Sequence, residues 1–333
     1  MTANSLSRVA AGASLDSSAS PALDLSEPPG VSVIIPAYNY AHYLGQAIAS
    51  VLAQTHCKLE LLVVDDGSTD HTRATVAAFQ DTRLRYLWQE NAGLSASRNT
   101  GIRESRHAFI AFLDADDIWK PEFLATALQQ FAALPEDFSA VGAATARMNA
   151  GGSPCAGPRY TSVDTGELTV RDFCLRNRPL SSSVVLKRRI FADCGGFDTA
   201  LRSSEDRDMW IRLTSRGHRF FFIGETLGFI RRHPENMSKN APRMKENSQR
   251  VLTRAWRHHA VSRLAVPFWL RAFALHFSLV AWTHFDDGMR VRALLYLFAS
   301  VGLWPIFLRP RRHFVRPLFR LRALAHFLLP RRA

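Results

Sequence analysis

Three pairs of acidic residues in this sequence have the type and spacing to bind a cation or move a proton. In the first pair, Asp114 and Asp116 follow the apolar run 109–113 with one alanine between them. Carboxylate oxygens suit Mg²⁺ or Mn²⁺, and Mg²⁺ takes one or two of them together with substrate phosphates. A solvated turn is the competing interpretation, since loops are rich in aspartate. Asp117 adds a third acid, so the metal ligand could be shifted by one position.

The second and third pairs are Asp65-Asp66 and Glu205-Asp206. Asp65-Asp66 ends an apolar run ahead of Gly67, so it is either a turn former or an acceptor of hydrogen bonds from a nucleobase or ribose. No G-x-G-x-x-G follows the first predicted strand, which disfavours a nicotinamide cofactor. Glu205-Asp206 opens a predicted helix, where the helix dipole favours acids in any case. The functional interpretation makes one of these two the general base for an attacking hydroxyl.

Two weaker motifs lie near these acids in the sequence. His233 belongs to the basic run 231–234, which could bind a diphosphate beside a metal ion. A lone histidine is more often structural. Gly196 and Phe197 offer a turn with an aromatic ring that suits contact with a sugar or an acceptor. Taken alone, that pair is better explained as an ordinary turn with a core phenylalanine.

Alternating strands and helices are expected to position these motifs. Apolar runs predict strands at 31–36, 59–64, 84–88, 109–113, 181–186, 220–223 and 227–231. Helical patterns follow the first strand and cover 72–80, 95–105 and 205–216. Asp70 is placed to cap the helix at 72–80. This alternation indicates a mainly parallel sheet, in which ligands gather at the carboxyl ends of strands. A Gly/Pro loop at 151–158 is expected to separate a nucleotide-binding half from an acceptor-binding half.

The charge of the chain is concentrated in one segment. The net charge is +13, and residues 245–333 hold 16 Lys plus Arg and 3 Asp plus Glu, which account for all of it (16 − 3 = 13). A nucleic-acid binder would rest on this segment alone, and it carries no recognition module. The four cysteines are scattered and show no zinc-binding spacing, so we expect reduced thiols. Residues 1–30 have the Ser, Ala and Pro content of a flexible leader without a secretory signal, which favours a cytoplasmic protein.

The order and spacing of the motifs resemble those of the family 2 glycosyltransferases, which have the GT-A fold. The resemblance covers residues 31–240 and rests on the segments 31–39, 65–70, 91–93, 96–99, 112–117, 195–198 and 205–206. It implies an α/β protein with a Rossmann-like mixed sheet. It also implies inverting transfer of a sugar, of hexosyltransferase type, from a nucleoside-diphosphate sugar to a hydroxyl. UDP is the default nucleotide, with GDP and dTDP open.

The resemblance also assigns roles to residues. Nucleotide binding would fall to Pro36, Ala37, Tyr38, Asp65, Asp66, Arg98 and Asp114. Asp66 would accept a hydrogen bond from the base, and Asp114 would contact the ribose or metal-bound water. Mg²⁺ or Mn²⁺ would be held by Asp116, Asp114 and His233. Asp206 would be the base, with Glu205 as the alternative. Gly196 and Phe197 would contact the acceptor or the sugar.

Residues 241–333 are basic and predicted to be mostly helical. The longest uncharged stretch, 293–308, has 16 residues and contains Pro305, whereas a membrane span needs roughly 20. Apolar residues recur at helical spacing over 314–328 beside Arg316, Arg320 and Arg322, which suits a helix on an anionic membrane surface. The alternative is a helical subdomain packed on the catalytic domain.

We therefore expect a cytoplasmic enzyme, peripheral on the inner face of the cell membrane, with a glycan or lipid-linked acceptor. Its pathway would be cell-surface polysaccharide or glycolipid synthesis. The competing hypothesis is a catalytically silent relative that acts as a basic membrane-surface or interaction module. The intact acids Asp66, Asp114, Asp116 and Asp206 argue against it.

Overall fold

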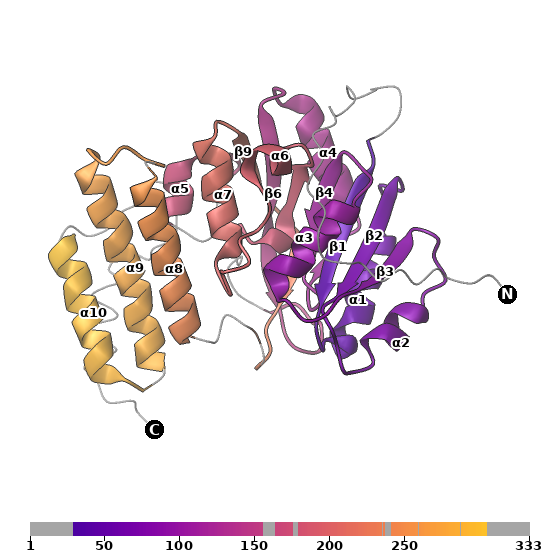
Figure 1. The fold of residues 1–333 in the computed structure, drawn as a ribbon, viewed down its shortest axis with the longest axis horizontal. Coiled ribbons are helices and arrows are strands. Elements are labelled where there is room, and N and C mark those ends of the chain that lie inside the picture. The colour runs from indigo at the N-terminus through magenta and orange to yellow at the C-terminus, as the bar shows by residue number, and fades with distance from the viewer. Residues whose placement is uncertain are drawn as a thin grey trace.

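The computed structural model shows one mixed β-sheet with helices on both faces and a row of three helices at one side (Figure 1). It describes residues 29–155, 164–175, 179–234, 236, 241–258, 260–286 and 288–304. The strand order is β3-β2-β1-β4-β8-β6-β9-β5, with β7 paired to β9.

The first half of the sheet is parallel, as the sequence predicts. It consists of β1 (Val31–Ala37), β2 (Leu59–Asp65), β3 (Leu84–Trp88) and β4 (Phe109–Phe112). The connecting helices are α1 (Ala41–Leu52), α2 (Thr72–Ala77) and α3 (Leu94–Glu104). Alternate residues of β1, β2 and β4 enter two separate core clusters, one on each face of the sheet. Burial on both faces explains why these strands read as continuous apolar runs.

The second half of the sheet mixes directions, so the expectation of a mainly parallel sheet is right only for the first half. β8 (Val184–Lys187) is antiparallel to β4 and to β6 (Phe138–Met148). β9 (Arg219–Arg231) is parallel to β6 but antiparallel to β5 (Ile118–Trp119) and β7 (Gly166–Leu168). The helices of this half are α4 (Phe123–Ala133), α5 (Val170–Leu175), α6 (Ile190–Cys194) and α7 (Glu205–Ser215).

Several strands differ from the sequence-based prediction. β5, β6 and β7 were not predicted, and the strand predicted at 181–186 begins only at Val184. The predicted short strands at 220–223 and 227–231 are one strand, β9, whose register against β6 shifts between Ile223 and Thr226. Gly224 and Glu225 fall in this shift, and their sequence resembles a turn. β6 was not predicted, because its sequence is rich in alanine and contains Gly142, residues with low strand propensity. A Cβ at Gly142 would lie 2.9 Å from Pro179, so close packing demands a small residue there.

Asp70 binds the start of the second helix, although the N-cap position is His71 and the helix is shorter than expected. The Asp70 carboxylate accepts hydrogen bonds from the backbone N–H of Thr72 at 2.9 Å and of Ala41 at 3.0 Å. These are the first residues of α2 and α1. One aspartate therefore holds the starts of two helices together, and α2 ends at Ala77 instead of Gln80.

The three C-terminal helices are α8 (Ala241–Arg257), α9 (Val266–Asp286) and α10 (Arg290–Leu303). Leu252 of α8 and Trp269 of α9 belong to the same core cluster as Trp210 of α7, so α8 and α9 pack on the sheet domain. The core thus continues beyond residue 240. Within the described residues, no helix is long and apolar enough to cross a membrane. The predicted surface helix at 314–328 lies outside the described residues.

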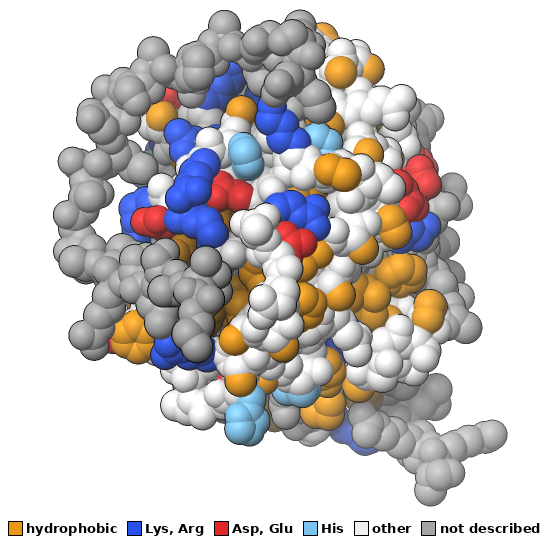
Figure 2. All heavy atoms as spheres, turned by 90° about the vertical axis from the view of Figure 1, so that its right-hand side faces the viewer, with side chains coloured by type: hydrophobic (Ala, Val, Ile, Leu, Met, Phe, Trp, Pro, Cys, Tyr) orange, Lys and Arg blue, Asp and Glu red, His pale blue; other side chains and the backbone are white. Residues whose placement is uncertain are grey.

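The face at the β3 and α2 end carries acidic and basic side chains beside one another, without a large field of one sign (Figure 2). This agrees with the sequence, in which residues 1–244 hold 26 basic and 26 acidic residues. The basic character belongs to the helical end of the chain.

Candidate active site

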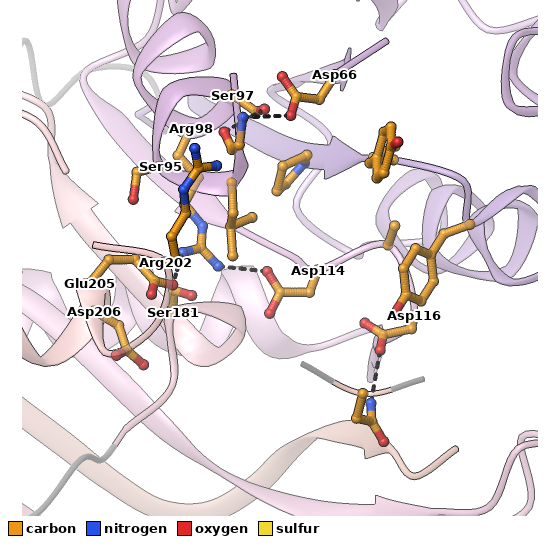
Figure 3. A pocket seen from close by; sticks show the side chains of 18 of the residues that line it. Asp66, Ser95, Ser97, Arg98, Asp114, Asp116, Ser181, Arg202, Glu205 and Asp206 are labelled. Atoms are coloured by element: carbon orange, nitrogen blue, oxygen red, sulfur yellow. Dashed lines mark hydrogen bonds and ion pairs between the residues drawn. The ribbon is translucent and has the colours of Figure 1, made fainter. Parts of the chain in front are cut away.

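An open cavity of about 900 Å³ lies where β1, β2 and β4 end and α3 and α7 begin (Figure 3). Parallel strands present their carboxyl ends at one edge of the sheet, which explains why motifs far apart in sequence meet there. The cavity is lined by most of the predicted site residues: Pro36, Ala37, Tyr38, Asp66, Arg98, Asp114, Asp116, Glu205 and Asp206.

The two carboxylates of the acidic turn after β2, Asp65 and Asp66, have different surroundings. Asp66 lines the cavity, and its carboxylate accepts hydrogen bonds from Gln89 Nε2 and from the backbone N–H of Ala92 and Gly93, at 2.6–3.0 Å. A carboxylate offers about four acceptor sites, so Asp66 keeps one for a ligand. Gly93 has a φ of 94°, a conformation that favours glycine at the start of α3.

Asp65 does not line the cavity, which corrects its assignment to the nucleotide. Its carboxylate accepts the backbone N–H of Ser68 at 2.8 Å and the hydroxyl of Tyr86 at 2.6 Å. Burial and this hydrogen bond raise the pKa of Tyr86 well above its ordinary value. Asp65 is therefore the turn former of the pair.

Arg98 joins the two acidic motifs that line opposite parts of the cavity. Its Nη2 donates to Asp114 Oδ1 at 2.7 Å and its Nη1 donates to Glu205 Oε1 at 2.6 Å (Figure 3). The side chain is 1% exposed, and its guanidinium lies 5.3 Å from the ring centre of Phe197. The two carboxylates hold the pKa of Arg98 above its ordinary value despite burial.

Asp206 and Glu205 are neighbours with different environments. Glu205 is committed to Arg98, whereas the hydrogen bond recorded for the Asp206 carboxylate comes from the backbone N–H of Arg207 at 2.7 Å. Burial, together with the charge of Glu205, raises the pKa of Asp206 to about 7. A buried carboxylate with such a pKa, facing a cavity, has the properties of a general base near neutral pH.

The run Asp114-Ala115-Asp116-Asp117 gathers negative charge at the end of β4. Burial and the charge of Asp114 raise the pKa of Asp116, and burial and the charge of Asp116 raise that of Asp117 well above its ordinary value. Asp117 accepts the backbone N–H of Arg231 at 3.0 Å. A cation between Asp114 and Asp116 would relieve their repulsion.

The residues present fit a divalent ion that takes one or two protein carboxylates and completes its shell with phosphate oxygens and water. The bonds of Asp114 and Asp116 engage Oδ1 and Oδ2 respectively, so each has a second oxygen free of them. Among the described residues, no three His, Cys, Asp or Glu side chains are grouped closely enough to hold a metal ion.

His233 does not line the cavity and lies against Asp116, so its assignment as a metal ligand stays a prediction. Its Nε2 lies 2.9 Å from Asp116 Oδ2, and Asn236 Nδ2 lies 3.2 Å from the same oxygen. The same Nε2 also lies 3.0 Å from Asn236 Nδ2, so His233, Asn236 and Asp116 form one contact group. His233 is buried beside the ring of Tyr43.

Gly196 and Phe197 do not line the cavity either, so their assignment to the acceptor or sugar is corrected. Asn99 of α3 exchanges two hydrogen bonds of 2.8 Å with the backbone of Phe197. A Cβ at Gly196 would lie 2.4 Å from Asn99 Oδ1, which explains the glycine. The Phe197 ring packs in the core against Phe112. The motif therefore fastens the segment before α7 to α3.

Sequence reasoning missed several residues that line the cavity. These are Tyr40, Ser181, Arg202 and Met244 among others. Arg202 lies four residues before Asp206, and that proximity could have indicated it. Met244 belongs to α8, which no sequence signal connected with the site. Arg231 of the basic run is buried, and its guanidinium donates to the backbone carbonyls of Asp116 and Ala150. Because these bonds occupy the guanidinium, it is not free to bind a diphosphate.

The comparisons with known proteins agree with this arrangement. Residues 32–154 match the family model described as glycosyl transferase family 2. An uncharacterized glycosyltransferase of Rickettsia prowazekii is 30% identical over 218 residues, which cover 64% of this chain and 67% of that protein. The chain belongs to glycosyl transferase family 2.

Shorter matches reach higher identity. The UDP-Glc:alpha-D-GlcNAc-diphosphoundecaprenol beta-1,3-glucosyltransferase WfgD of Escherichia coli is 49% identical over 90 residues, 27% of this chain and 36% of that protein. An uncharacterized glycosyltransferase of Nostoc is 44% identical over 104 residues, 30% of this chain and 32% of that protein. The chain thus spans about a third of the length of these two relatives.

Solved structures share the fold. The mannosyltransferase PcManGT of Pyrobaculum calidifontis, in complex with GDP-Man and Mn²⁺, has a TM-score of 0.60 at 19% identity and covers 83% of this chain and 76% of that chain. TarS residues 1–349 of S. aureus, in complex with UDP-GlcNAc, has a TM-score of 0.54 at 18% identity, with 83% and 89% covered. The chain has the GT-A fold, as the sequence predicts.

Proposed function

We propose that this protein is an active, inverting, metal-dependent hexosyltransferase that uses a nucleoside-diphosphate sugar, with UDP as the default nucleotide. One observation carries the proposal. Asp66, Asp116 and Asp206, from three separate elements, line one cavity, and Asp206 is left as the carboxylate that can accept a proton. A catalytically silent relative would not need this set.

The nucleotide would lie along the ends of β1, β2 and β4. Pro36, Ala37 and Tyr38 would flank the base, with Tyr38 47% exposed and able to stack on it. Asp66 would accept a hydrogen bond from a base N–H with its remaining lone pair. Asp114 would accept from the ribose or from water, oriented by Arg98.

Asp116, with Asp114, would hold the divalent ion. Bound there with the donor, Mg²⁺ or Mn²⁺ would offset the charge that develops on the leaving diphosphate. His233 and Asn236 fix the Asp116 carboxylate in position for this role. A related fold in complex with GDP-Man and Mn²⁺ supports the choice of cation.

Asp206 would take the proton of the acceptor hydroxyl as its oxygen attacks the anomeric carbon. Displacement in one step from the face opposite the diphosphate inverts that carbon. Glu205 is disfavoured as the base because its carboxylate is bound to Arg98.

The acceptor is proposed to be a glycan or a lipid-linked glycan in cell-surface polysaccharide or glycolipid synthesis. The relative WfgD, named for a diphosphoundecaprenol-linked acceptor, supports this direction. A place on the inner face of the cell membrane would give the enzyme access to such an acceptor. The basic composition of residues 245–333 supports that location.

The decisive experiment is calorimetric binding of UDP, GDP and dTDP with Mn²⁺ or Mg²⁺, followed by donor hydrolysis or transfer with UDP-sugars. We expect one nucleotide to bind in the micromolar range and turnover to stop when a chelator is added. Failure of every nucleoside diphosphate and every nucleotide sugar to bind would refute the proposal.

A further inference from the structure

Among the residues that the structure describes, nothing covers an apolar face of α10 on the outside of the molecule. Figure 1 shows α10 as the outermost of the three C-terminal helices. Val291, Leu295 and Phe298 are 74%, 63% and 61% exposed, and Val301 is 39% exposed. Their spacing of three or four residues places them on one side of the helix. We call these four residues the α10 outer face.

The orientation of α10 is fixed, so this face cannot turn inward. Ala293 and Leu297 are buried against Ala281 and Phe285 of α9. Between them and the helix end, the hydroxyl of Ser300 lies 2.6 Å from that of Ser278 and donates to the carbonyl of Ala274 at 2.7 Å. Rolling the helix would bury the outer face only by exposing these contacts.

Leaving such a face in water is costly. Burial of a Val, Leu or Phe side chain is favourable relative to exposure, because it removes apolar surface from water. Monomeric proteins seldom leave several such side chains contiguous unless they mark a contact surface. The α10 outer face therefore needs an occupant.

The positive charge of this part of the chain indicates what binds to the α10 outer face. α10 begins with the exposed Arg290 and Arg292, and residues 288–304 contain no Asp or Glu. In the sequence, residues 305–333 add eight arginines and again no acid. A second copy docked symmetrically on this face would bring like charges together, whereas an anionic lipid surface attracts them.

We propose that the α10 outer face lies in the headgroup region of an anionic membrane, with α10 in the plane of the surface. The helix has 14 residues, a length of about 21 Å, which is too short for a hydrocarbon core of about 30 Å. This inference deepens the proposed membrane location and rests on it. α8 lies two helices inward from α10 and contributes Met244 to the cavity wall, so the C-terminal helices connect the outer face with the cavity.

The test is sedimentation of the full chain with vesicles of phosphatidylcholine alone or with roughly 30% phosphatidylglycerol. The variant Leu295→Gln/Phe298→Gln removes apolar area from the outer face and keeps good helix formers. The control is Leu264→Gln/Val266→Gln, whose side chains are 91% and 54% exposed in the segment between α8 and α9 and at the start of α9. Circular dichroism and UDP binding check that each variant is folded.

We expect the full chain to bind the anionic vesicles, the outer-face variant to bind about tenfold or more weakly, and the control to bind nearly as the full chain does. Equal binding by the outer-face variant overturns the proposal, and so does an equal loss in the control. A dimer in solution that the outer-face variant dissociates would assign the face to a second copy and also overturn it. If the full chain does not bind anionic vesicles but still transfers sugar, the proposed membrane location is wrong. The proposal of a sugar transferase is unaffected by that result.

Discussion

Arg98 Nη1 donates to Glu205 Oε1 at 2.6 Å, linking α3 to the first residue of α7 across 107 positions of sequence. Both side chains are almost fully buried, and Arg98 reaches Asp114 with its other terminal nitrogen. This contact distinguishes two neighbouring acids that the sequence could not. Glu205 neutralises the buried guanidinium of Arg98, which leaves Asp206 as the proposed base.

Replacing Arg98 is expected to damage both stability and turnover. Arg98→Met leaves Glu205 buried without its counter-ion, which costs on the order of 3–5 kcal/mol. Urea denaturation measures the loss. Arg103→Met, an exposed position on the same helix, is the matched control and should change stability by less than about 0.5 kcal/mol. Equal stability of the two variants would contradict the bridging role of Arg98.

The two acids at the start of α7 are expected to fail in different ways when neutralised. Asp206→Asn should reduce kcat by about a thousandfold or more while UDP binds almost as before. Glu205→Gln should instead lower the free energy of unfolding, because the buried charge of Arg98 then loses one of its two carboxylate partners. Transfer assays combined with calorimetry separate the two. Normal turnover by Asp206→Asn would eliminate it as the base.

The raised pKa of Asp206 gives a pH dependence with opposite signs for activity and stability. A base must be ionised, so kcat should fall as pH drops through the Asp206 pKa of about 7. In the unfolded chain this carboxyl titrates near its ordinary value, so the folded state binds the extra proton. Stability should therefore decline as pH rises from about 4 to above 7. Asp206→Asn should reduce that decline, by on the order of 1–3 kcal/mol at pH 8, and the raised pKa values of Asp116 and Asp117 leave the rest. Thermal unfolding of the unsubstituted protein and of Asp206→Asn, measured without nucleotide at roughly unit steps from pH 5 to pH 8, tests this pH dependence of stability.

The sequence predicted the parallel half of the fold well because its signals are local. β1, β2 and β4 are buried on both faces and read as apolar runs, and Asp70 marks a helix start by its type and position. β6 could not be predicted in this way. Its alanines have low strand propensity, and Gly142 is required by close packing against Phe220, a contact between residues far apart in the chain.

The same distinction holds in the site. The acids at strand ends were predictable, because carboxyl ends of parallel strands share an edge. Which oxygen each acid uses was not. Asp65 accepts a hydrogen bond from Tyr86, which is 21 residues away in sequence. His233 contacts Asp116, which is 117 residues away. Role assignment therefore needed tertiary contacts, whereas site location did not.

Metal binding is expected to depend on Asp116 more than on His233. Asp116→Asn should abolish the tightening of UDP binding by Mn²⁺, because it removes the charge at the centre of the predicted site. His233→Gln keeps a donor near Asp116 and should weaken the Mn²⁺ effect by about tenfold at most, as expected for a supporting residue. Calorimetric titration of UDP with and without Mn²⁺ compares the variants. A larger loss of the Mn²⁺ effect in His233→Gln than in Asp116→Asn would indicate that His233 binds the metal directly.

The helix α8 is expected to be part of the catalytic domain's cooperative unit, because it shares a core with α7. Leu252 is fully buried in the cluster that contains Trp210, whereas Leu295 of α10 is 63% exposed. Leu252→Ala should therefore cost about 2–4 kcal/mol, and Leu295→Ala less than about 0.5 kcal/mol. Unfolding monitored by tryptophan fluorescence and by loss of UDP binding should coincide in both variants. If Leu252→Ala melts the C-terminal helices while UDP binding persists, α8 forms a separate unit and the shared core contributes little to the site.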